Sequence, residues 1–462
     1  MDNRVYIRRC EEYDRTAIEN LVCEGMAALD FRPRGKIFVK PNVVFAGPAG
    51  MLGNDACTPA AVVGASLLAL ARSPGVERVD LGEKSAVGIP TRMCYRFAGY
   101  YDELKRIRPL SPRPLGIFCI DEERRDPVFI GGAVHDNLRV ARKMARADFK
   151  VYLPRLKCHC VSNMTGAVKL NVGICSDDER SIRHDFMLNE KIADLLAPGW
   201  PDFVIMDAIE VGVGNEAYPS LRKLGLVLMG RNPVAVDLVG ARLLGYGLTD
   251  VPYLMAAVRR GYGPASLDDV KLEGDIKSVA ELDEQAKRVM PYDDEFHRWQ
   301  DVSKEFERLQ TPMRFYWGPY REGLADKCLT GCVMGIKMWM ASYERYAGPG
   351  VFASAKPVVF VIGKVDEEID ARGGTVFLLG SCARAQINNA RKVVRIDKCF
   401  TTASDMSLQI GPWLGMPFPS VNPKFMLPYV GAIALAGLRK LVSLRYFQDL
   451  GHFVSKRLIR NI

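Results

Sequence analysis

Short apolar runs alternate with longer amphipathic stretches through the first 270 residues. "KIFVKPNVV", "VERVDLGE", "FKVYLP", "DFVIMDAIE" and "KLGLVLMG" predict buried strands, whereas "TPAAVVGASLLALARS" and "NPVAVDLVGARLLG" predict helices. Each helix is expected to begin with a polar cap followed by proline, Thr58 before Pro59 and Asn232 before Pro233. Strands that alternate with helices predict an α/β fold, with a largely parallel sheet core and helices on both faces.

The pattern changes after residue 270 and divides the chain into four expected parts. Residues 1–270 form the α/β core domain, and the charged, helix-prone residues 271–325 form a helical connecting segment. Residues 326–420 form a smaller α/β unit that bears cysteines, with "PVVFVIG" and "GTVFLLG" as strands. Residues 421–462 are apolar and basic, and predict a C-terminal helix packed on the body; membrane contact by this helix is the less favoured alternative. The sequence shows no internal repeat.

Charge and length narrow the class of protein. The 462 residues suffice for two or three domains, and 63 Lys and Arg are interspersed with 54 Asp and Glu. The positive charge is small and is spread along the chain. It favours a small anionic substrate over nucleic acid, because nucleic-acid-binding proteins usually cluster their basic residues. The N-terminus has no secretory pattern, and the apolar stretch Met426–Leu438 is shorter than the roughly 20 residues that span a bilayer. We therefore expect a cytoplasmic protein whose 12 cysteines are buried, catalytic or metal-bound rather than disulfide-bonded.

Polar residues follow several of the predicted strands. In parallel α/β sheets, ligands bind beyond the carboxyl ends of the strands. The polar residues at these places are Lys40, Asn42, Lys157, His159 and Asp207. The sequence therefore predicts a polar pocket at this edge of the sheet.

The stretch "PRLKCHCVSNMTGAVKLNVG", residues 154–173, adds to this pocket. Thr165 and Lys169 are four residues apart, so on a helix capped by Ser162 or Asn163 they would share one face. The lysines, the imidazole and the helix N-terminus favour a carboxylate, phosphate or enolate. The groups that we expect to be catalytic are Lys40, Lys157, His159 and Lys169. The alternative is that the lysines are solvated surface residues, and the role of Cys158 and Cys160 stays open.

Five segments, in order, resemble the domain of unknown function 362 family. They are "GKIFVKPNVV", "PRLKCHCVSNMTGAVKLNVG", "RSIRHD", "DFVIMDAIEVGVGN" and "LMGRNPVAVDLVGARLLG". The resemblance implies an α/β core and an association with iron–sulfur modules. Its matched positions imply that substrate-binding residues include Asn42, Thr165, His184 and Asp207. A standard ferredoxin module is excluded, because the chain has no C-x-x-C-x-x-C run.

Four cysteines of the smaller unit form a candidate metal site. Cys328 and Cys332 are a close pair in "DKCLTGCVMG", while Cys382 and Cys399 each follow a predicted strand. A close pair and two distant thiols can complete a tetrahedral thiolate site, although free cysteines are also common in cores. The residues alone leave zinc and a cluster open; the family resemblance favours an iron–sulfur cluster of the 4Fe–4S type.

The combined expectation is an iron–sulfur-dependent enzyme, with a reductase favoured. A small anionic or carbonyl substrate would occupy the Lys/His-lined pocket, and an electron-donor protein would be a partner. The alternatives are a non-redox iron–sulfur lyase or hydratase, a non-catalytic electron-transfer or cluster-bearing partner protein, and a zinc-stabilised binding protein.

Overall fold

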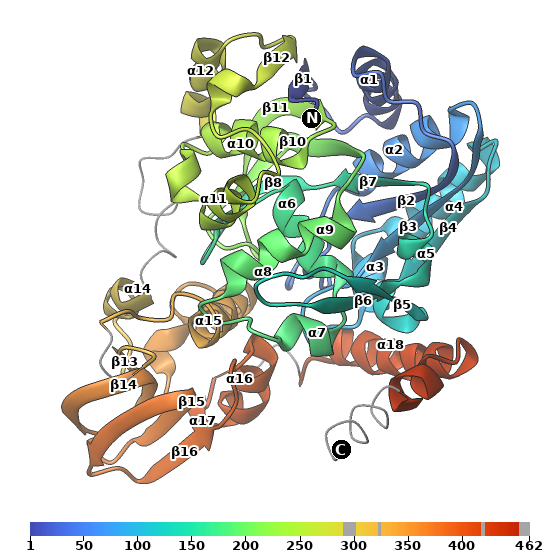
Figure 1. Ribbon diagram of the computed structural model, residues 1–462. Helices are drawn as coiled ribbons and strands as arrows, with labels where there is room; N and C mark the ends of the chain where they lie inside the picture. Colours follow the sequence, from blue (N-terminus) through green and yellow to red (C-terminus); the bar gives the residue numbers. More distant parts are fainter. Residues whose placement is uncertain (290–301, 322–324, 417–420, 452–462) are drawn as a thin grey trace.

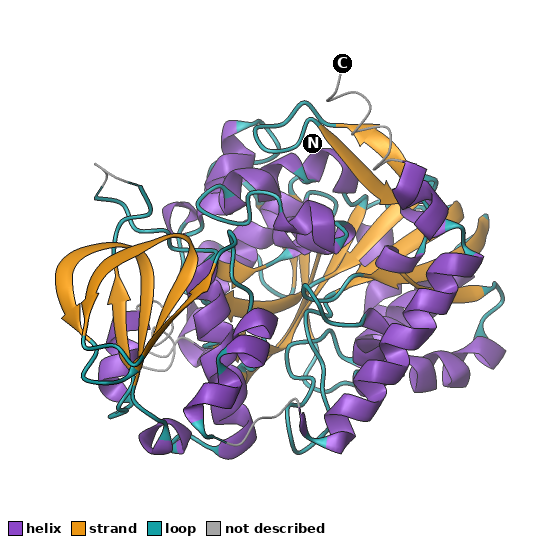
Figure 2. Ribbon diagram, turned by 90° about the horizontal axis from the view of Figure 1, so that it is seen from below, coloured by secondary structure: helices purple, strands orange, loops and turns teal. Residues whose placement is uncertain are grey.

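The computed structural model describes residues 1–289, 302–321, 325–416 and 421–451. Within them, ten strands form one large, mostly parallel sheet with helices on both faces (Figures 1 and 2). The strands are β1 (Arg4–Arg9), β2 (Gly35–Pro41), β3 (Val76–Glu83), β4 (Leu115–Cys119), β7 (Phe149–Leu153), β8 (Arg155–His159), β9 (Asn163–Thr165), β10 (Phe203–Val213), β11 (Ser220–Gly230) and β12 (Lys271–Gly274). The predicted α/β fold is confirmed.

The order of the strands places a crossover beside β2. Neighbours in the sheet run β12-β1-β11-β10-β7-β2-β3-β4, and β8 pairs with β10 and β9. From β2 the chain continues through β3 to β4 on one side, and then returns to add β7 on the other side of β2. Such a switch point opens a crevice at the carboxyl ends of the strands, where ligands bind in open α/β sheets.

Helices cover the sheet between these strands. They are α1 (Arg15–Ala28), α2 (Ala60–Arg72), α3 (Thr91–Phe97), α4 (Tyr100–Ile107), α5 (Arg142–Ala145), α6 (Ala167–Leu170), α7 (Asp177–Ser181), α8 (Leu188–Asp194), α9 (Leu196–Gly199), α10 (Pro233–Leu243), α11 (Pro252–Arg259) and α12 (Val279–Val289). A hairpin of β5 (Arg125–Phe129) and β6 (Asn137–Ala141) lies outside the large sheet.

One of the two predicted helix caps is present. The Asn232 side chain accepts the backbone N–H of Val234 at the start of α10. At α2 the cap residue is Pro59, and the Thr58 hydroxyl instead donates to the carbonyl of Leu153 at 2.6 Å. The same hydroxyl accepts the N–H of Asn42. Thr58 thus joins the ends of β2 and β7, because a hydroxyl can donate and accept at once.

Much of the expected connecting segment, residues 271–325, belongs to the two folded units. β12 extends the large sheet beside β1, and α12 packs against α10 and β11. The apolar side of α12 is buried at Leu282 and Val289. This amphipathic helix therefore packs on the core domain instead of forming an exposed connection between the two units. Farther along, α14 (Val302–Arg308) packs against β13 (Arg314–Trp317) of the smaller unit. Residues 290–301 and 322–324 of the segment lie outside the described residues.

The smaller unit is a coil of parallel strands beside a helix (Figure 2). Its elements are β13, α15 (Cys332–Ala347), β14 (Val358–Asp370), β15 (Thr375–Asn388), β16 (Lys392–Ile396), α16 (Ala403–Gln409) and α17 (Gly411–Leu414). β14 and β15 run parallel although a short turn joins them, so the chain must bend back within each strand.

The bends of this coil fall at glycines with positive φ, Gly363 and Gly380. Val358 pairs with Thr375, and Thr375 pairs with Lys392, which gives a repeat of 17 residues. This spacing belongs to the strand pairing, and the sequence itself shows no internal repeat.

The C-terminal helix α18 (Pro423–Val442) lies along the lower side of the molecule in Figure 1. Its buried side chains, Phe425 and Ala432, face the body, while most of the helix is exposed. Among the described residues it is the one helix that is long and apolar enough to cross a membrane, judged by length and composition alone. It is longer than the apolar stretch Met426–Leu438 because it includes basic residues at both ends. Residues 452–462 of the expected helix lie outside the described residues.

A buried ion pair joins the carboxyl ends of β2 and β3. The Lys40 Nζ lies 2.5 and 2.6 Å from the two carboxylate oxygens of Glu83, and both side chains are inaccessible to solvent. Burial lowers the pKa of Lys40, and the adjacent Glu83 opposes that shift. The pair fixes two neighbouring strand ends, since either charge alone would be costly to bury.

Replacement of Lys40 by methionine should lower the free energy of unfolding by about 3–5 kcal/mol, because Glu83 would remain buried without its partner. Urea denaturation followed by circular dichroism measures the loss. The double variant Lys40→Met/Glu83→Gln should recover most of it. Equal destabilisation of the single and double variants would contradict a pair held by charge.

Candidate functional site

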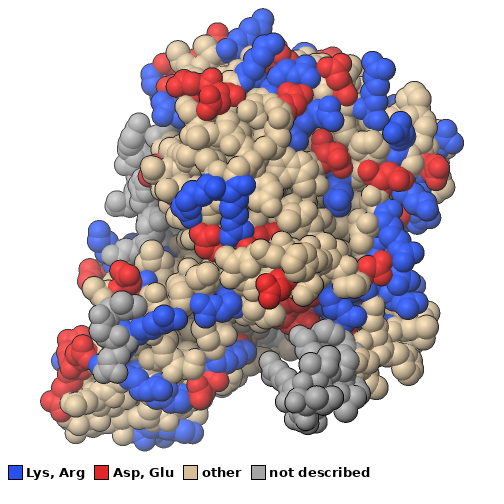
Figure 3. All heavy atoms as spheres, viewed as in Figure 1, with Lys and Arg blue, Asp and Glu red and all other residues tan. Residues whose placement is uncertain are grey.

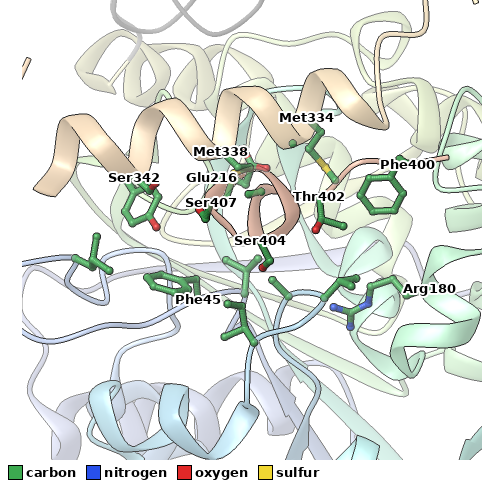
Figure 4. A pocket seen from close by; sticks show the side chains of 18 of the residues that line it. Phe45, Arg180, Glu216, Met334, Met338, Ser342, Phe400, Thr402, Ser404 and Ser407 are labelled. Carbon is green, nitrogen blue, oxygen red and sulfur yellow. The ribbon is translucent and has the colours of Figure 1, made fainter. Parts of the chain in front are cut away.

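A cavity of about 320 Å³ lies between the core, the smaller unit and α18. Figure 4 shows Met334 and Met338 of α15, with Thr402 before α16, facing Phe45 and Arg180 of the core. Most of the wall is apolar. The apolar lining residues include Val44, Phe45, Leu52, Ile89, Met334, Met338, Phe400, Leu408, Phe425 and Met426.

The ionisable residues of the wall come from the ends of core elements. They are His159 at the end of β8, Lys169 of α6, Arg180 of α7, His184, and Glu216 in the turn after β10. The cavity thus combines ionisable groups from the core with an apolar wall completed by α15, α16 and α18. This combination suits a molecule with one polar group and an apolar body.

His159 and Glu216 lie side by side at the polar end of the cavity. The backbone N–H groups of Val161 and Ser162 point at His159 Nδ1, so that nitrogen is an acceptor and the proton lies on Nε2. His159 Nε2 lies 3.3 Å from Glu216 Oε1. Burial and neighbouring lysines lower the pKa of His159 to about 3, so the imidazole is neutral at pH 7.

Glu216 is ionised although it is buried. Burial acts to raise its pKa, but His159, the hydrogen bond from Cys160 and the charge of Lys169 lower it to about 2. The N–H of Cys160 donates to Glu216 Oε2 at 3.2 Å. The carboxylate therefore holds the imidazole in one tautomer and orientation.

Lys169 faces the cavity and makes no hydrogen bond or ion pair with any described residue. Burial lowers its pKa to about 8, against the attraction of Glu216. Lys157 is buried behind the cavity wall, where its Nζ donates to the carbonyl of Glu216, and burial lowers its pKa to about 7. Lys169 is thus the lysine that is placed to bind or protonate a ligand.

Asp237 of α10 sets the position of Lys169. The Asp237 carboxylate accepts the N–H groups of Ala167 and Val168, the first two residues of α6, at 2.6 and 2.9 Å. The expected cap by Ser162 or Asn163 is wrong: the cap residue is Gly166, and the Asn163 side chain donates to the carbonyl of Asp250. The N–H groups expected to face a ligand are therefore already bonded to Asp237.

The other residues predicted from the sequence do not line the cavity. Lys40 pairs with Glu83, and the backbone of Asn42 is bonded to Thr58. Thr165 ends β9 and does not share a helix with Lys169. Asp207 is buried with Arg155 at 3.7 Å and the Tyr13 hydroxyl at 3.3 Å. These residues support the strands near the cavity rather than contact its contents.

Two residues of the polar end were missed by the sequence analysis. Arg180 donates to the carbonyls of Lys84 and Ser85, and its guanidinium borders the cavity. Glu216 follows the glycine turn after β10. The position of Glu216 just after a predicted strand could have identified it as a site residue, as the same kind of position identified His159.

The four cysteines of the smaller unit come together at one end of the coil. Cys332 begins α15, and Cys328 lies just before it. Cys382 and Cys399 follow the paired residues Leu379 and Ile396 by the same three positions. Burial raises the pKa of Cys399 to about 12, and the negative charges of Asp185 and of the other three cysteines add to the shift.

Two glycines let the thiols approach the backbone closely. A Cβ at Gly380, where φ is +97°, would lie 2.9 Å from the Cys332 sulfur and 3.8 Å from the Cys382 sulfur. A Cβ at Gly331 would lie 3.6 Å from the Cys328 sulfur. The N–H of Thr401 points at the Cys332 sulfur at 3.2 Å. Several thiols beside small residues and a backbone donor together fit a thiolate-bound inorganic centre.

The thiol group and the cavity share a wall. Phe400, which follows Cys399, stacks on His184 with ring centroids 4.7 Å apart, and both rings line the cavity. Cys399 Sγ lies 4.0 Å from Asp185 Oδ2, on the residue after His184. The chain therefore passes directly from Cys399 into the wall of the cavity.

A second group could hold a metal ion. The ligand atoms of His159, Cys160 and Glu216 all lie within 4.8 Å of one another, and all three residues are buried. The carbonyl of Cys160 accepts a hydrogen bond from Lys337 of α15. Cys160 is thereby placed beside the polar end of the cavity, whereas Cys158 packs in the core.

Two solved structures are similar to part of the chain. No curated protein matches the chain. A lactate racemase apoprotein from Thermoanaerobacterium thermosaccharolyticum is 12% identical, with a TM-score of 0.33 over 52% of this chain and 56% of that one. A protein from Thermotoga maritima is 11% identical, with a TM-score of 0.28 over 46% and 56%. The chain thus spans little more than half of either structure, and these likenesses do not extend to function.

The family comparison is more informative. A family model described as domain of unknown function (DUF362) matches residues 37–242, from β2 to the end of α10. This span contains His159, Lys169, Glu216 and Asp237, and it ends before the cysteine-bearing unit. The match over residues 37–242 supports the resemblance of this part of the chain to the domain of unknown function 362 family.

Proposed function

We propose that the protein is an iron–sulfur reductase of a molecule with a carbonyl or carboxylate head and an apolar body. The single observation that carries the proposal is the wall shared by the thiol group and the cavity, formed by Phe400 on His184. Cys328, Cys332, Cys382 and Cys399 would hold the centre. When bound, an iron–sulfur cluster supplies electrons one at a time to a substrate nearby.

The spacing of the thiols favours a cluster over zinc. Zinc binds sulfur at about 2.3 Å, so its four tetrahedral sulfurs lie about 3.8 Å apart. Among the described residues, no three of these cysteine sulfurs lie within 4.8 Å of one another. A larger inorganic centre accommodates the wider spacing, and the N-terminus of α15 at Cys332 favours its thiolates.

The polar end of the cavity accounts for substrate binding and proton delivery. Lys169 has a cationic form near neutral pH and no partner among the residues that the structure describes, so it can bind the oxygen of the head group and then donate its proton there. The Glu216 carboxylate, 3.3 Å from His159 Nε2, keeps the imidazole in place beside the head group. The apolar wall excludes water and strengthens both interactions.

The reaction balances as the addition of two electrons and two protons to a carbonyl or a conjugated double bond. The electrons come from a reduced electron-donor protein, which is the partner that the proposal requires. One proton comes from Lys169, which solvent reprotonates through the open side of the cavity, and the second proton comes from solvent by the same route. A lysine that must be protonated loses activity as the pH rises through its pKa.

Protein purified without oxygen should contain about four iron and four sulfide per chain, with broad absorption at about 400 nm. Cys382→Ser should lower the iron content, because it removes a ligand. Gly380→Ala should do the same by filling the space beside Cys332. Inductively coupled plasma mass spectrometry and a sulfide assay measure the content.

The matched control is Cys23→Ser, since Cys23 is exposed on α1, far from the other thiols in sequence and outside the smaller unit. It should leave iron and sulfide unchanged. Zinc in place of iron, or equal iron in Cys382→Ser and wild type, would contradict the cluster.

Lys169→Gln should keep the cluster and its reduction by dithionite, but slow substrate-dependent reoxidation by about 100-fold or more. The measurement follows the absorption at about 400 nm after enones, aldehydes and enoates of increasing chain length are added. In the wild type the rate should fall as pH rises through about 8, where Lys169 loses its proton. The control is Lys36→Gln, an exposed lysine on β2.

A carrier protein would give a different result. It would transfer electrons to an acceptor protein equally well with and without Lys169, and no cavity ligand would alter the reoxidation rate. That outcome would exclude the reductase.

The non-redox alternative has its own observation in the group of His159, Cys160 and Glu216. A metal ion bound there could polarise a carbonyl and support a lyase or hydratase. Metal that is lost in Glu216→Gln but kept in Cys382→Ser would favour this alternative.

A further inference from the structure

The outer face of α18 is apolar along its whole length. Leu427 is 73% exposed, Leu438 57% and Val442 71%, and the exposed apolar residues continue beyond the helix to Phe447 and Leu450. Figure 3 shows mostly uncharged atoms where α18 reaches the surface beside the grey C-terminal residues. Exposure of this many large apolar side chains on one helix marks a surface that is covered in its working state.

Polar contacts at both ends hold α18 flat against the core. The Tyr429 hydroxyl donates to the carbonyl of Gly88 at 2.9 Å, near the start of the helix. The Ser443 hydroxyl donates to the carbonyl of Glu122, and Arg445 donates to the carbonyl of Glu123, both at 2.8 Å. A helix that spanned a bilayer would lose these contacts, so the geometry favours an in-plane position with one face on the protein.

The charges of α18 are of one sign. The helix has no acidic residue, and its charged side chains are Lys424, Arg439 and Lys440. The exposed Tyr446 and Phe447 follow it. Basic residues that border an apolar face, together with interfacial aromatic residues, are complementary to an anionic lipid surface.

The cavity opens beside this surface. Leu408 of α16 lines the cavity and is 70% exposed, so it lies at the mouth. Met426 of α18 lines the same cavity, and the next residue, Leu427, belongs to the exposed apolar face. Figure 1 places α16 and α18 on the same lower side of the molecule.

We propose that α18 docks the protein in the plane of an anionic lipid bilayer, with the cavity mouth at Leu408 and Met426 facing the lipid. The apolar wall of the cavity then continues the apolar phase of the membrane. A consequence, which rests on the proposed function, is that the substrate is a lipophilic molecule dissolved in the bilayer. Its polar head would reach Lys169 while its apolar body remains against Met334 and Phe425.

Sedimentation of the full chain with lipid vesicles tests the docking without any substrate. The protein should sediment with vesicles that contain about 30% phosphatidylglycerol in phosphatidylcholine, and more weakly with phosphatidylcholine alone. Leu427→Glu/Leu438→Glu should lower the bound fraction at least about tenfold, because both side chains leave the apolar face charged. Both residues are exposed, so thermal unfolding of the variant should match the wild type.

Leu110→Glu is the matched control. Leu110 is 50% exposed and lies five residues before β4, whereas α18 packs against the residues that follow that strand, so this variant should bind vesicles like the wild type. Wild-type protein that stays in solution with both vesicles, or a double variant that binds equally well, would overturn the docking.

Light scattering tests whether a second copy of the chain, rather than lipid, covers the apolar face of α18. A wild-type dimer that Leu438→Glu converts to a monomer, without vesicle binding by either, would assign the face to self-association and overturn the proposal. Failure here leaves the iron content and the Lys169 measurement unaffected, so the docking and the reductase can fail separately.

Discussion

The in-register pairing of parallel coils places Cys382 and Cys399 at the same corner of the smaller unit, and the candidate site depends on that placement. Parallel strands keep equivalent positions of successive coils adjacent, so a 17-residue repeat brings together two thiols that are 17 residues apart. The start of α15 adds the other two thiols at the same end. The chain then passes directly from Cys399 to Phe400, which forms part of the cavity wall.

The core contributes a complementary set of constraints. Residues of the α6 region cannot hydrogen-bond to a neighbouring strand, so Asp237 satisfies their N–H groups and thereby fixes Lys169. The Lys40–Glu83 ion pair likewise fixes the ends of β2 and β3 relative to each other. These buried charges are partnered, whereas Lys169 lacks a partner among the described residues and borders the cavity. That contrast separates the supporting residues from those that can act on a ligand.

Features that depend on residues close together in the sequence could be predicted, whereas features that depend on contacts between distant segments could not. Apolar runs identified the main strands, and the local Asn232–Pro233 pattern identified the start of α10. The roles of Lys40 and Asp207 were not predictable, because their partners, Glu83 and Arg155, lie on other elements. The four cysteines were predicted as residues of one unit, but how they approach one another depends on a coil whose 17-residue spacing is visible only in the backbone pairing. The polarity of the cavity was also missed: its apolar wall comes from α15, α16 and α18, which the sequence assigned to other parts of the chain.

The central claim is that these thiols hold iron against the cavity. Anomalous diffraction from crystals grown without oxygen, recorded on both sides of the iron absorption edge, tests it most directly. We predict a strong iron peak surrounded by the sulfurs of Cys328, Cys332, Cys382 and Cys399, beside the Phe400 ring. A map with no iron at these sulfurs, or with zinc there instead, would contradict the account.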